Sequence, residues 1–218
     1  MSVVSPGLRT RIRGIATPIA LAMGKVGLTP NALTLIGFGI AILAAIAAGL
    51  QSWVVAGFLV VFGGVFDLFD GALARATNKA SPLGAFMDST FDRWGEAILY
   101  IGIVWGAIGL GIELPVVLAA AAMASAFMVS YTRAKSESLG FAPGTGMANV
   151  GLAPREIRIV ILTLGLVLAG LLPTTTSDAA ATPPNVIALE LALGLIAVLA
   201  TITTIQRILH VRAQSREG

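Results

Sequence analysis

The stretch FDLFDGALARATNKASPLGAFMDSTFDR, residues 66–93, places four aspartates in a chain that is otherwise poor in charge. They are Asp67, Asp70, Asp88 and Asp92. Of the 218 residues, 56% are hydrophobic and only 11% are charged, whereas about 25% of the residues of a soluble domain are charged. The composition indicates a protein that crosses a membrane several times, so four neighbouring carboxylates need a specific reason.

The four aspartates are expected to converge between two helices. The apolar segments on either side of residues 76–83 form a hairpin. Asp67 and Asp92 are about equally far along the chain from the middle of that loop, so they are expected at a similar depth in the membrane. The same holds for Asp70 and Asp88. Spacings of three and four residues place each pair on one face of its helix. At about 1.5 Å of rise per residue, all four lie within about 15 Å of one membrane surface.

Such a cluster predicts a site for divalent metal ions. Even on a lenient scale, a charge at the bilayer centre costs about 2.5–3.5 kcal/mol, and four anions also repel one another. Carboxylate oxygens suit Mg²⁺ or Mn²⁺, and two such ions can clamp a phosphoryl group. The chain has no cysteine and a single histidine, His210, which excludes thiolate sites and most imidazole sites. A salt-bridge network with Arg75 and Arg93 is the alternative, but two arginines leave the four acids unbalanced.

The rest of the sequence predicts an all-α, polytopic membrane protein with six transmembrane helices. Each of six apolar segments is long enough to cross about 30 Å of hydrocarbon. Before them, residues 7–25 combine arginines with apolar residues and are expected to form an amphipathic helix in the membrane interface. The expected spans are residues 31–50, 53–75, 84–110, 114–135, 157–172 and 185–208. We expect one domain, 1–218, made of an interfacial segment (1–30), a membrane core (31–208) and a cytoplasmic tail (209–218).

The basic residues predict how the chain is oriented. With six spans, the N-terminal segment, the 75–84 loop, the 133–158 region and the C-terminal tail share one side of the membrane. All fourteen Lys and Arg residues fall in these regions or, for Arg93, in the nearby half of a span. By the positive-inside rule that side is cytoplasmic. We therefore expect a multi-pass protein of the cell membrane with both termini and the aspartates on the cytoplasmic side.

The aspartate stretch resembles the signature of a known enzyme family. Written as a pattern, it is Asp67-x2-Asp70-Gly71-x2-Ala74-Arg75-x8-Gly84-x3-Asp88-x3-Asp92. It resembles the signature of the CDP-alcohol phosphatidyltransferases in every fixed position. The segment LTPNALTLIG, residues 28–37, also resembles the entry to the first span of that family. The resemblance implies an enzyme that transfers a phosphatidyl group from CDP-diacylglycerol to an alcohol and releases CMP. It also implies a homodimer in membrane lipid, and no nucleic-acid partner is expected.

The resemblance implies a role for each matching residue. Asp67, Asp70 and Asp88 would bind two metal ions, Mg²⁺ or Mn²⁺. Asp92 would contact the second ion and act as the general base for the attacking hydroxyl. The CDP part of the donor would be held by Asn31, Ala32, Leu33, Thr34, Gly71, Arg75 and Ser81.

The acceptor is predicted from basic residues outside the signature. The candidates for binding an acceptor phosphate are Arg133, Lys135, Arg155, Arg158 and Arg207. Several cations beside spans suit a phosphorylated polyol better than choline or ethanolamine. The positive-inside rule alone is the competing explanation for each of them.

Two of these basic segments resemble those of phosphatidylinositol phosphate synthases. The resemblance rests on Ser130-Tyr131 before the alternating Arg133 and Lys135, and on Gln206-Arg207 in the last span. The chain departs from that subgroup at REIR, residues 155–158, where Pro-Glu is usual between the two arginines. It also has Asn31 where an acidic residue is common. We expect inositol 1-phosphate as the acceptor, with glycerol 3-phosphate, or a different lipid donor, as alternatives.

A membrane transporter is the alternative from another functional class, because carboxylates inside membranes also mark ion pathways. The absence of paired inverted repeats speaks against it. Two further acids are singled out by their positions. Glu96, one turn after Asp92, is a candidate partner for the site, and Glu190 is expected near the outer end of the last span.

Overall fold

The computed structural model describes residues 6–141, 147, 150–178 and 181–216, without the side chains of residues 6–13. The described residues are all-α. Their helices are α1 (Pro6–Lys25), α2 (Pro30–Gly49), α3 (Trp53–Ala76), α4 (Pro82–Gly109), α5 (Glu113–Ser138), α6 (Arg155–Leu171) and α7 (Pro184–Gln214). The all-α prediction is therefore confirmed, and most expected segments agree with the helices to within about three residues. The main difference is α7, which continues to Gln214, so much of the expected tail is helical.

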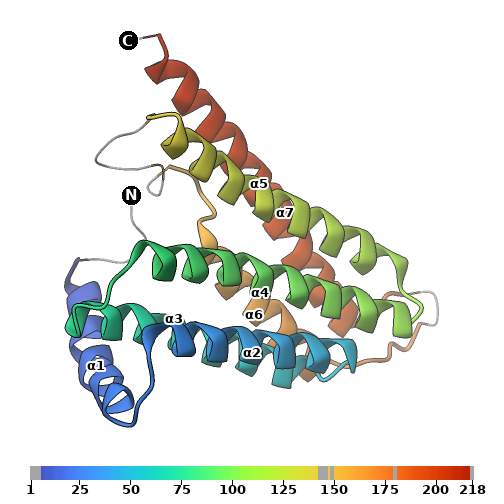
Figure 1. Ribbon diagram of the computed structural model, residues 1–218. Helices are drawn as coiled ribbons and strands as arrows, with labels where there is room; N and C mark the ends of the chain where they lie inside the picture. Colours follow the sequence, from blue (N-terminus) through green and yellow to red (C-terminus); the bar gives the residue numbers. More distant parts are fainter. Residues whose placement is uncertain (1–5, 142–146, 148–149, 179–180, 217–218) are drawn as a thin grey trace.

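Six of the helices form a closed ring. Neighbours around the ring are α2 and α3, α3 and α6, α6 and α7, α7 and α5, α5 and α4, and finally α4 and α2. Figure 1 shows α2, α3 and α4 side by side, with α5 and α7 crossing them at an angle. The α5–α7 pair diverges from α4 toward the end of the ring where α1 and the C-terminal end of α7 lie. At that same end, α1 crosses the ends of α2 and α3 and packs on α3.

The interior of the ring is built from small and aliphatic side chains. Ala44, Ala48, Ala119 and Ala122 are buried in the main core beside Tyr100. Large apolar side chains point outward instead, as Phe58, Phe62, Val117 and Leu191 do. Small residues between helices and large apolar residues around them suit a bundle surrounded by lipid, where backbones pack closely and hydrocarbon covers the outside.

Length and composition identify four membrane-crossing helices within the described residues: α2, α3, α5 and α7. The other two predicted spans, α4 and α6, do not meet the same description. Helix α4 carries Asp88, Asp92, Arg93 and Glu96 in its first half, and α6 has only 17 residues. The membrane-protein prediction is confirmed, and the count of six spans remains a prediction.

Helices α2 and α4 begin with the same capping motif. Thr29 precedes Pro30 and accepts a hydrogen bond from the backbone N–H of Ala32 at 3.2 Å. Ser81 precedes Pro82 and accepts one from the N–H of Gly84 at 3.0 Å. A hydroxyl cap followed by proline is a strong start signal, because it satisfies a free N–H and fixes the first helical φ. The caps thus fix where α2 and α4 begin, and residues of both starts line one pocket.

Candidate active site

The aspartate hairpin and the start of α2 enclose a first pocket, which we call the hairpin pocket. Its volume is about 200 Å³. It is lined by Pro30, Asn31, Thr34, Asp70, Gly71, Ala74, Arg75, Lys79, Ala80, Ser81, Gly84, Ala85 and Asp88. The N-termini of α2 and α4 both contribute to this wall, and helix N-termini favour anions through their free N–H groups and the helix dipole.

The glycines of the signature make room in the hairpin pocket. A Cβ atom at Gly71 would lie 3.1 Å from Nη1 of Arg75, one turn further along α3. A Cβ at Gly84 would lie 3.2 Å from the Ser81 hydroxyl and 3.4 Å from Oδ1 of Asn31. Side chains at these positions would therefore crowd the groups that face the pocket. Arg75 itself is exposed and forms no ion pair with any described residue.

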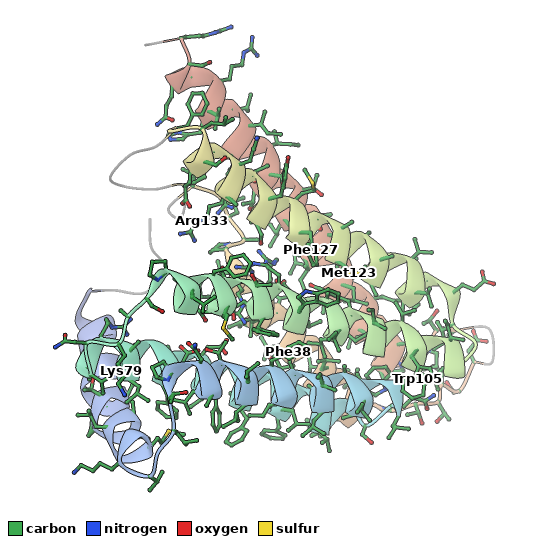
Figure 2. All side chains as sticks on the ribbon, viewed as in Figure 1. Phe38, Lys79, Trp105, Met123, Phe127 and Arg133 are labelled. Atoms are coloured by element: carbon green, nitrogen blue, oxygen red, sulfur yellow. The ribbon has the colours of Figure 1, made fainter. Side chains whose placement is uncertain are left out.

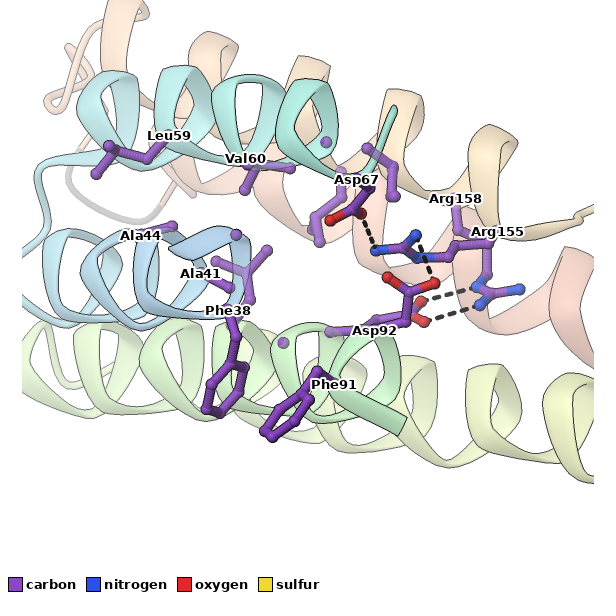
Figure 3. Close-up of a pocket in the computed structure, with 18 of the residues that line it drawn as sticks. Phe38, Ala41, Ala44, Leu59, Val60, Asp67, Phe91, Asp92, Arg155 and Arg158 are labelled. Atoms are coloured by element: carbon purple, nitrogen blue, oxygen red, sulfur yellow. Dashed lines mark hydrogen bonds and ion pairs between the residues drawn. The ribbon is translucent and has the colours of Figure 1, made fainter. Parts of the chain in front are cut away.

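The aspartates have different partners. Asp70 is buried and accepts a hydrogen bond from the Thr34 hydroxyl at 2.7 Å. Asp67 and Asp92 are joined through Arg155, whose Nη2 lies 3.0 Å from Asp67 and whose Nη1 lies 2.8 Å from Asp92. Figure 3 shows this guanidinium between the two carboxylates, among the residues that line a cavity of about 70 Å³ inside the ring. Asp88 forms no hydrogen bond or ion pair with a described residue.

A second ion pair lies directly beside the first. Arg158 is 1% exposed, and its Nε and Nη2 both donate to Glu96 at 2.9 Å. Its Nη1 donates to the carbonyl of Ala153 at 3.0 Å. Such a two-pronged contact fixes the guanidinium in one orientation. Glu96 also lies 3.5 Å from Nη1 of Arg93, so this carboxylate forms ion pairs with two arginines.

A larger pocket, which we call the arginine pocket, opens between α4 and the α5–α7 pair. Its volume is about 710 Å³. It is lined by Asp88, Ser89, Asp92, Arg93, Phe127, Val129, Ser130, Tyr131, Arg133, Ala134, Glu137, Pro154, Arg155, Glu156, Arg158 and Arg207. Figure 2 shows Arg133 on the side of α5 that faces this opening. Asp88 lines both pockets, so the hairpin pocket and the arginine pocket meet at that carboxylate.

The segment before α6 is held in place by α7. The Thr203 hydroxyl accepts hydrogen bonds from the N–H groups of Leu152 at 3.1 Å and Ala153 at 2.9 Å. Arg207 is 3% exposed and donates to the carbonyls of Val150 and Val129. These contacts fix the start of α6, and with it Arg155, relative to α5 and α7.

The structure brings most predicted residues to the two pockets. Asn31, Thr34, Gly71, Arg75 and Ser81 line the hairpin pocket, and Arg133, Arg155, Arg158 and Arg207 line the arginine pocket. Ala32 and Leu33 do not line the hairpin pocket, and Leu33 is fully buried against α1 and α3. Lys135 is exposed and lies outside the arginine pocket.

Sequence reasoning missed two contributors. Arg93 lines the arginine pocket, and its spacing of three residues from Glu96 was a usable signal for their ion pair. Thr203 had no sequence signal, because the amides it binds are 50 and 51 residues away. Glu190 is partly exposed near the start of α7, in agreement with its expected place.

The carboxylates are not arranged as a closed metal cage. Within the described residues, no three acidic or histidine side chains lie close enough to enclose a metal ion. Arg155 separates Asp67 from Asp92, while Asp70 is turned toward Thr34. The four aspartates nevertheless fit a hard divalent ion, because they offer only oxygen donors and Asp88 has no hydrogen-bond or ion-pair partner among the described residues.

Comparisons with known proteins agree with one another. Residues 27–211 match the model of the family described as CDP-alcohol phosphatidyltransferase. The chain is 31% identical to the archaetidylinositol phosphate synthase of Pyrococcus horikoshii, over 97% of this chain and 98% of the relative. It is 34% identical to the phosphatidylinositol phosphate synthase of Cutibacterium acnes, over 91% of this chain and 92% of the relative.

Solved structures show the same similarity. The structure is similar to that of the Mycobacterium tuberculosis phosphatidylinositol phosphate synthase with CDP-DAG bound, with a TM-score of 0.78 and 27% identity. That match covers 90% of this chain and 93% of the other. The same enzyme in complex with manganese and citrate matches with a TM-score of 0.77 and 26% identity, over 90% of this chain and 88% of the other.

Proposed function

This chain belongs to the CDP-alcohol phosphatidyltransferase family, and we propose that it transfers the phosphatidyl group of CDP-diacylglycerol to inositol 1-phosphate. The reaction class follows from family membership and from the named relatives. The chain is therefore an enzyme and a multi-pass membrane protein, and the transporter alternative is set aside. The acceptor, the metal ions and the individual residue roles are the proposed part.

One observation carries the proposal: the hairpin pocket and the arginine pocket meet at Asp88. A pocket with two helix N-termini and an available arginine suits the pyrophosphate of a CDP-linked donor. A pocket with five arginines suits an acceptor that carries its own phosphate. Their junction would bring donor and acceptor together beside Asp88 and Asp92, where the transfer would take place.

The donor would be held by the signature and by the start of α2. Arg75 is free to form charge-assisted hydrogen bonds with phosphate oxygens, and Gly71 leaves space for its guanidinium. Ser81 and Asn31 lie at the two converging helix starts. The hydrogen bond from Thr34 keeps Asp70 directed to this wall. Ala32 and Leu33 do not line the hairpin pocket and are left out of the binding set.

The proposed chemistry needs one proton acceptor. The acceptor hydroxyl oxygen bonds to the phosphorus that carries diacylglycerol, and the bond from that phosphorus to CMP breaks. The electron pair of the broken bond leaves with CMP. Asp92 lines the arginine pocket and would take the hydroxyl proton. Arg155 contacts Asp92 and fixes the direction of its carboxylate.

Asp67, Asp70, Asp88 and Asp92 are the residues that would hold divalent ions, and we propose two ions, Mg²⁺ or Mn²⁺. Bound there, the ions would neutralise phosphate charge and polarise the transferred group. The relative of known structure that is complexed with manganese supports this choice of metal. The oxygens of Asp67 and Asp92 that Arg155 now contacts are within the proposed set, so Arg155 would have to give up part of its contact.

The acceptor phosphate would be held in the arginine pocket. Of the predicted cations, Arg133, Arg155, Arg158 and Arg207 line it, and Lys135 is left out because it lies outside. Inositol 1-phosphate is favoured over free inositol because a neutral hydroxyl cannot replace a phosphate on desolvated arginines.

The proposed topology has six membrane spans with a cytoplasmic site. Helix α6, with 17 residues, is about 26 Å long, which is at the lower limit for a span. Helix α4 packs against both α2 and α5. The basic residues then lie on the cytoplasmic side together with both termini.

We also propose a homodimer. The small-residue stretch of residues 119–126 gives limited support, because Ala119, Ala122 and Ala126 are buried in the chain's own core. Mass measurement in mild detergent should give twice the chain mass, and a monomer alone would contradict this.

The reaction can be tested directly with purified protein. CDP-diacylglycerol and Mg²⁺ are supplied with inositol 1-phosphate, glycerol 3-phosphate and free inositol in competition, and the lipid products are resolved by mass spectrometry. Phosphatidylinositol phosphate should dominate. A product containing only glycerol phosphate would overturn the acceptor and keep the reaction class. A parallel reaction with an archaeal-type CDP-lipid tests the donor.

A further inference from the structure

The five arginines of the arginine pocket are not equally available to a ligand. They are Arg93, Arg133, Arg155, Arg158 and Arg207. A guanidinium has five N–H donors, and those already used by protein oxygens cannot also bind a substrate phosphate. The number of hydrogen bonds that each arginine already makes to the protein therefore distinguishes the arginines that can bind the acceptor from those that only form the pocket wall.

Three of the five are largely committed to the protein. All three nitrogens of Arg158 donate to Glu96 or to the carbonyl of Ala153. Arg207 is buried and donates from two nitrogens to backbone carbonyls. Arg155 is divided between Asp67 and Asp92, and its buried Nε has no hydrogen-bond partner among the described residues. Arg158 and Arg207 therefore hold α4, α6 and the preceding segment in place.

Arg133 has one ordinary surface contact. Its Nε donates to Glu137 at 2.9 Å, and the two side chains are 49% and 43% exposed. An exposed pair four residues apart on one helix is weak and easily exchanged for a ligand. Arg133 can therefore reach an acceptor phosphate, although water competes for the same donors.

Arg93 differs from the other four arginines because its side chain forms no hydrogen bond with any described residue. Its side chain is 28% exposed, and its only described contact is an ion pair at 3.5 Å between Nη1 and Glu96. The buried Nη1 has no hydrogen bond to any described residue. Glu96 already accepts two bonds from Arg158, so one carboxylate faces two guanidinium groups. A partly desolvated cation with unused donors needs a further anion.

The other charges around Arg93 direct that anion to the pocket. Asp92 precedes it on α4 and is held by Arg155. Asp88 lines the same pocket one turn earlier and belongs to the proposed metal site. Glu137 and Glu156 also line the pocket, and Glu137 pairs with Arg133. Among the described residues, Arg93 forms an ion pair only with Glu96, so its pocket side, beside the proposed general base Asp92, is left for a ligand anion.

We propose that Arg93 binds the phosphate of the acceptor, opposite Arg133, and that Glu96 positions its guanidinium. The ligand class is a phosphomonoester of a small polyol. This assignment rests on the proposed function and deepens it, since it distinguishes the cations that select a phosphorylated acceptor from those that build the pocket.

The test uses the full-length enzyme in detergent with Arg93→Gln, Arg93→Lys and a matched control, Arg212→Gln. Arg212 is an exposed arginine of α7 that lies outside both pockets. Arg93→Gln should raise the KM for inositol 1-phosphate by about tenfold or more, as expected for a lost charged hydrogen bond. The KM for CDP-diacylglycerol should stay within about twofold, Arg93→Lys should recover part of the loss, and Arg212→Gln should match wild type.

A second readout separates binding from folding. Equilibrium binding of labelled inositol 1-phosphate should weaken in Arg93→Gln, while thermal protection by a CDP-lipid analogue is kept. Unchanged acceptor KM and binding, or an equal change in both substrates' KM, would overturn the role of Arg93 alone. A wild-type enzyme that makes no CMP with any phosphorylated acceptor would overturn the proposed function itself.

Discussion

The hairpin pocket and the arginine pocket share Asp88 but hold their charges in different ways. In the hairpin pocket, Arg75 is exposed and has no ion-pair partner among the described residues. In the arginine pocket, Arg155, Arg158 and Arg207 are fixed by protein oxygens. Available charge suits a donor nucleotide common to a whole family. Fixed charge suits a rigid wall around the acceptor site, and the unused donors of Arg93 and Arg133 are left to bind the acceptor phosphate.

The largest expected effect concerns the carboxylates at the junction. Chelation of divalent ions with EDTA should abolish turnover, because the four aspartates offer only oxygen ligands for hard cations. Release of CMP from CDP-diacylglycerol measures this, and added Mg²⁺ or Mn²⁺ should restore it. Full activity in metal-free buffer would remove the basis of the proposed metal site.

The aspartates should also separate into two roles. Asp92→Asn should lower kcat by about 10²–10⁴-fold, because a general base is lost, while binding of the CDP-lipid is kept. Asp67→Asn should weaken metal and nucleotide binding together. Calorimetric titration of each variant with CDP and Mn²⁺ makes the comparison. Equal nucleotide affinity in wild type and Asp67→Asn would contradict a metal-ligand role for Asp67.

Breaking the buried ion pair of Arg158 should destabilise the protein more than breaking the exposed ion pair of Arg133. Glu96→Gln should lower the free energy of unfolding by about 3–5 kcal/mol, because it leaves the buried Arg158 without its anion. The matched control is Glu137→Gln, which breaks the exposed pair with Arg133 and should cost less than about 1 kcal/mol. Thermal unfolding in mild detergent compares them, and equal shifts would refute the distinction.

Most of the hairpin pocket could be predicted because it is local in sequence. The signature covers residues 67–92, and its spacings translate directly into one face of each helix. The first turn of α2 was less predictable, because Asn31 and Thr34 line the pocket while Leu33 packs with α1 and α3. A run of consecutive helical residues cannot all face one ligand.

The arginine pocket was harder to predict because four helices and a loop contribute to it. Lys135, two residues after Arg133, is turned away by the helical period. The partner of Arg158 lies 62 residues earlier, and the contacts of Arg207 reach back 57 and 78 residues. Sequence indicated that these cations gather on one side of the membrane, but not which of them are already neutralised.

We assign the hairpin pocket to the donor and the arginine pocket to the acceptor. Measuring both KM values in one variant of each pocket tests this assignment most directly. Arg75→Gln and Arg133→Gln are each assayed for the KM of CDP-diacylglycerol and of inositol 1-phosphate. Arg75→Gln should raise the donor KM by about tenfold and leave the acceptor KM within about twofold. Arg133→Gln should raise the acceptor KM by about threefold, a smaller effect because its charge is exposed, and leave the donor KM unchanged. If both variants raise the same KM, or each raises both equally, the two pockets do not serve separate substrates.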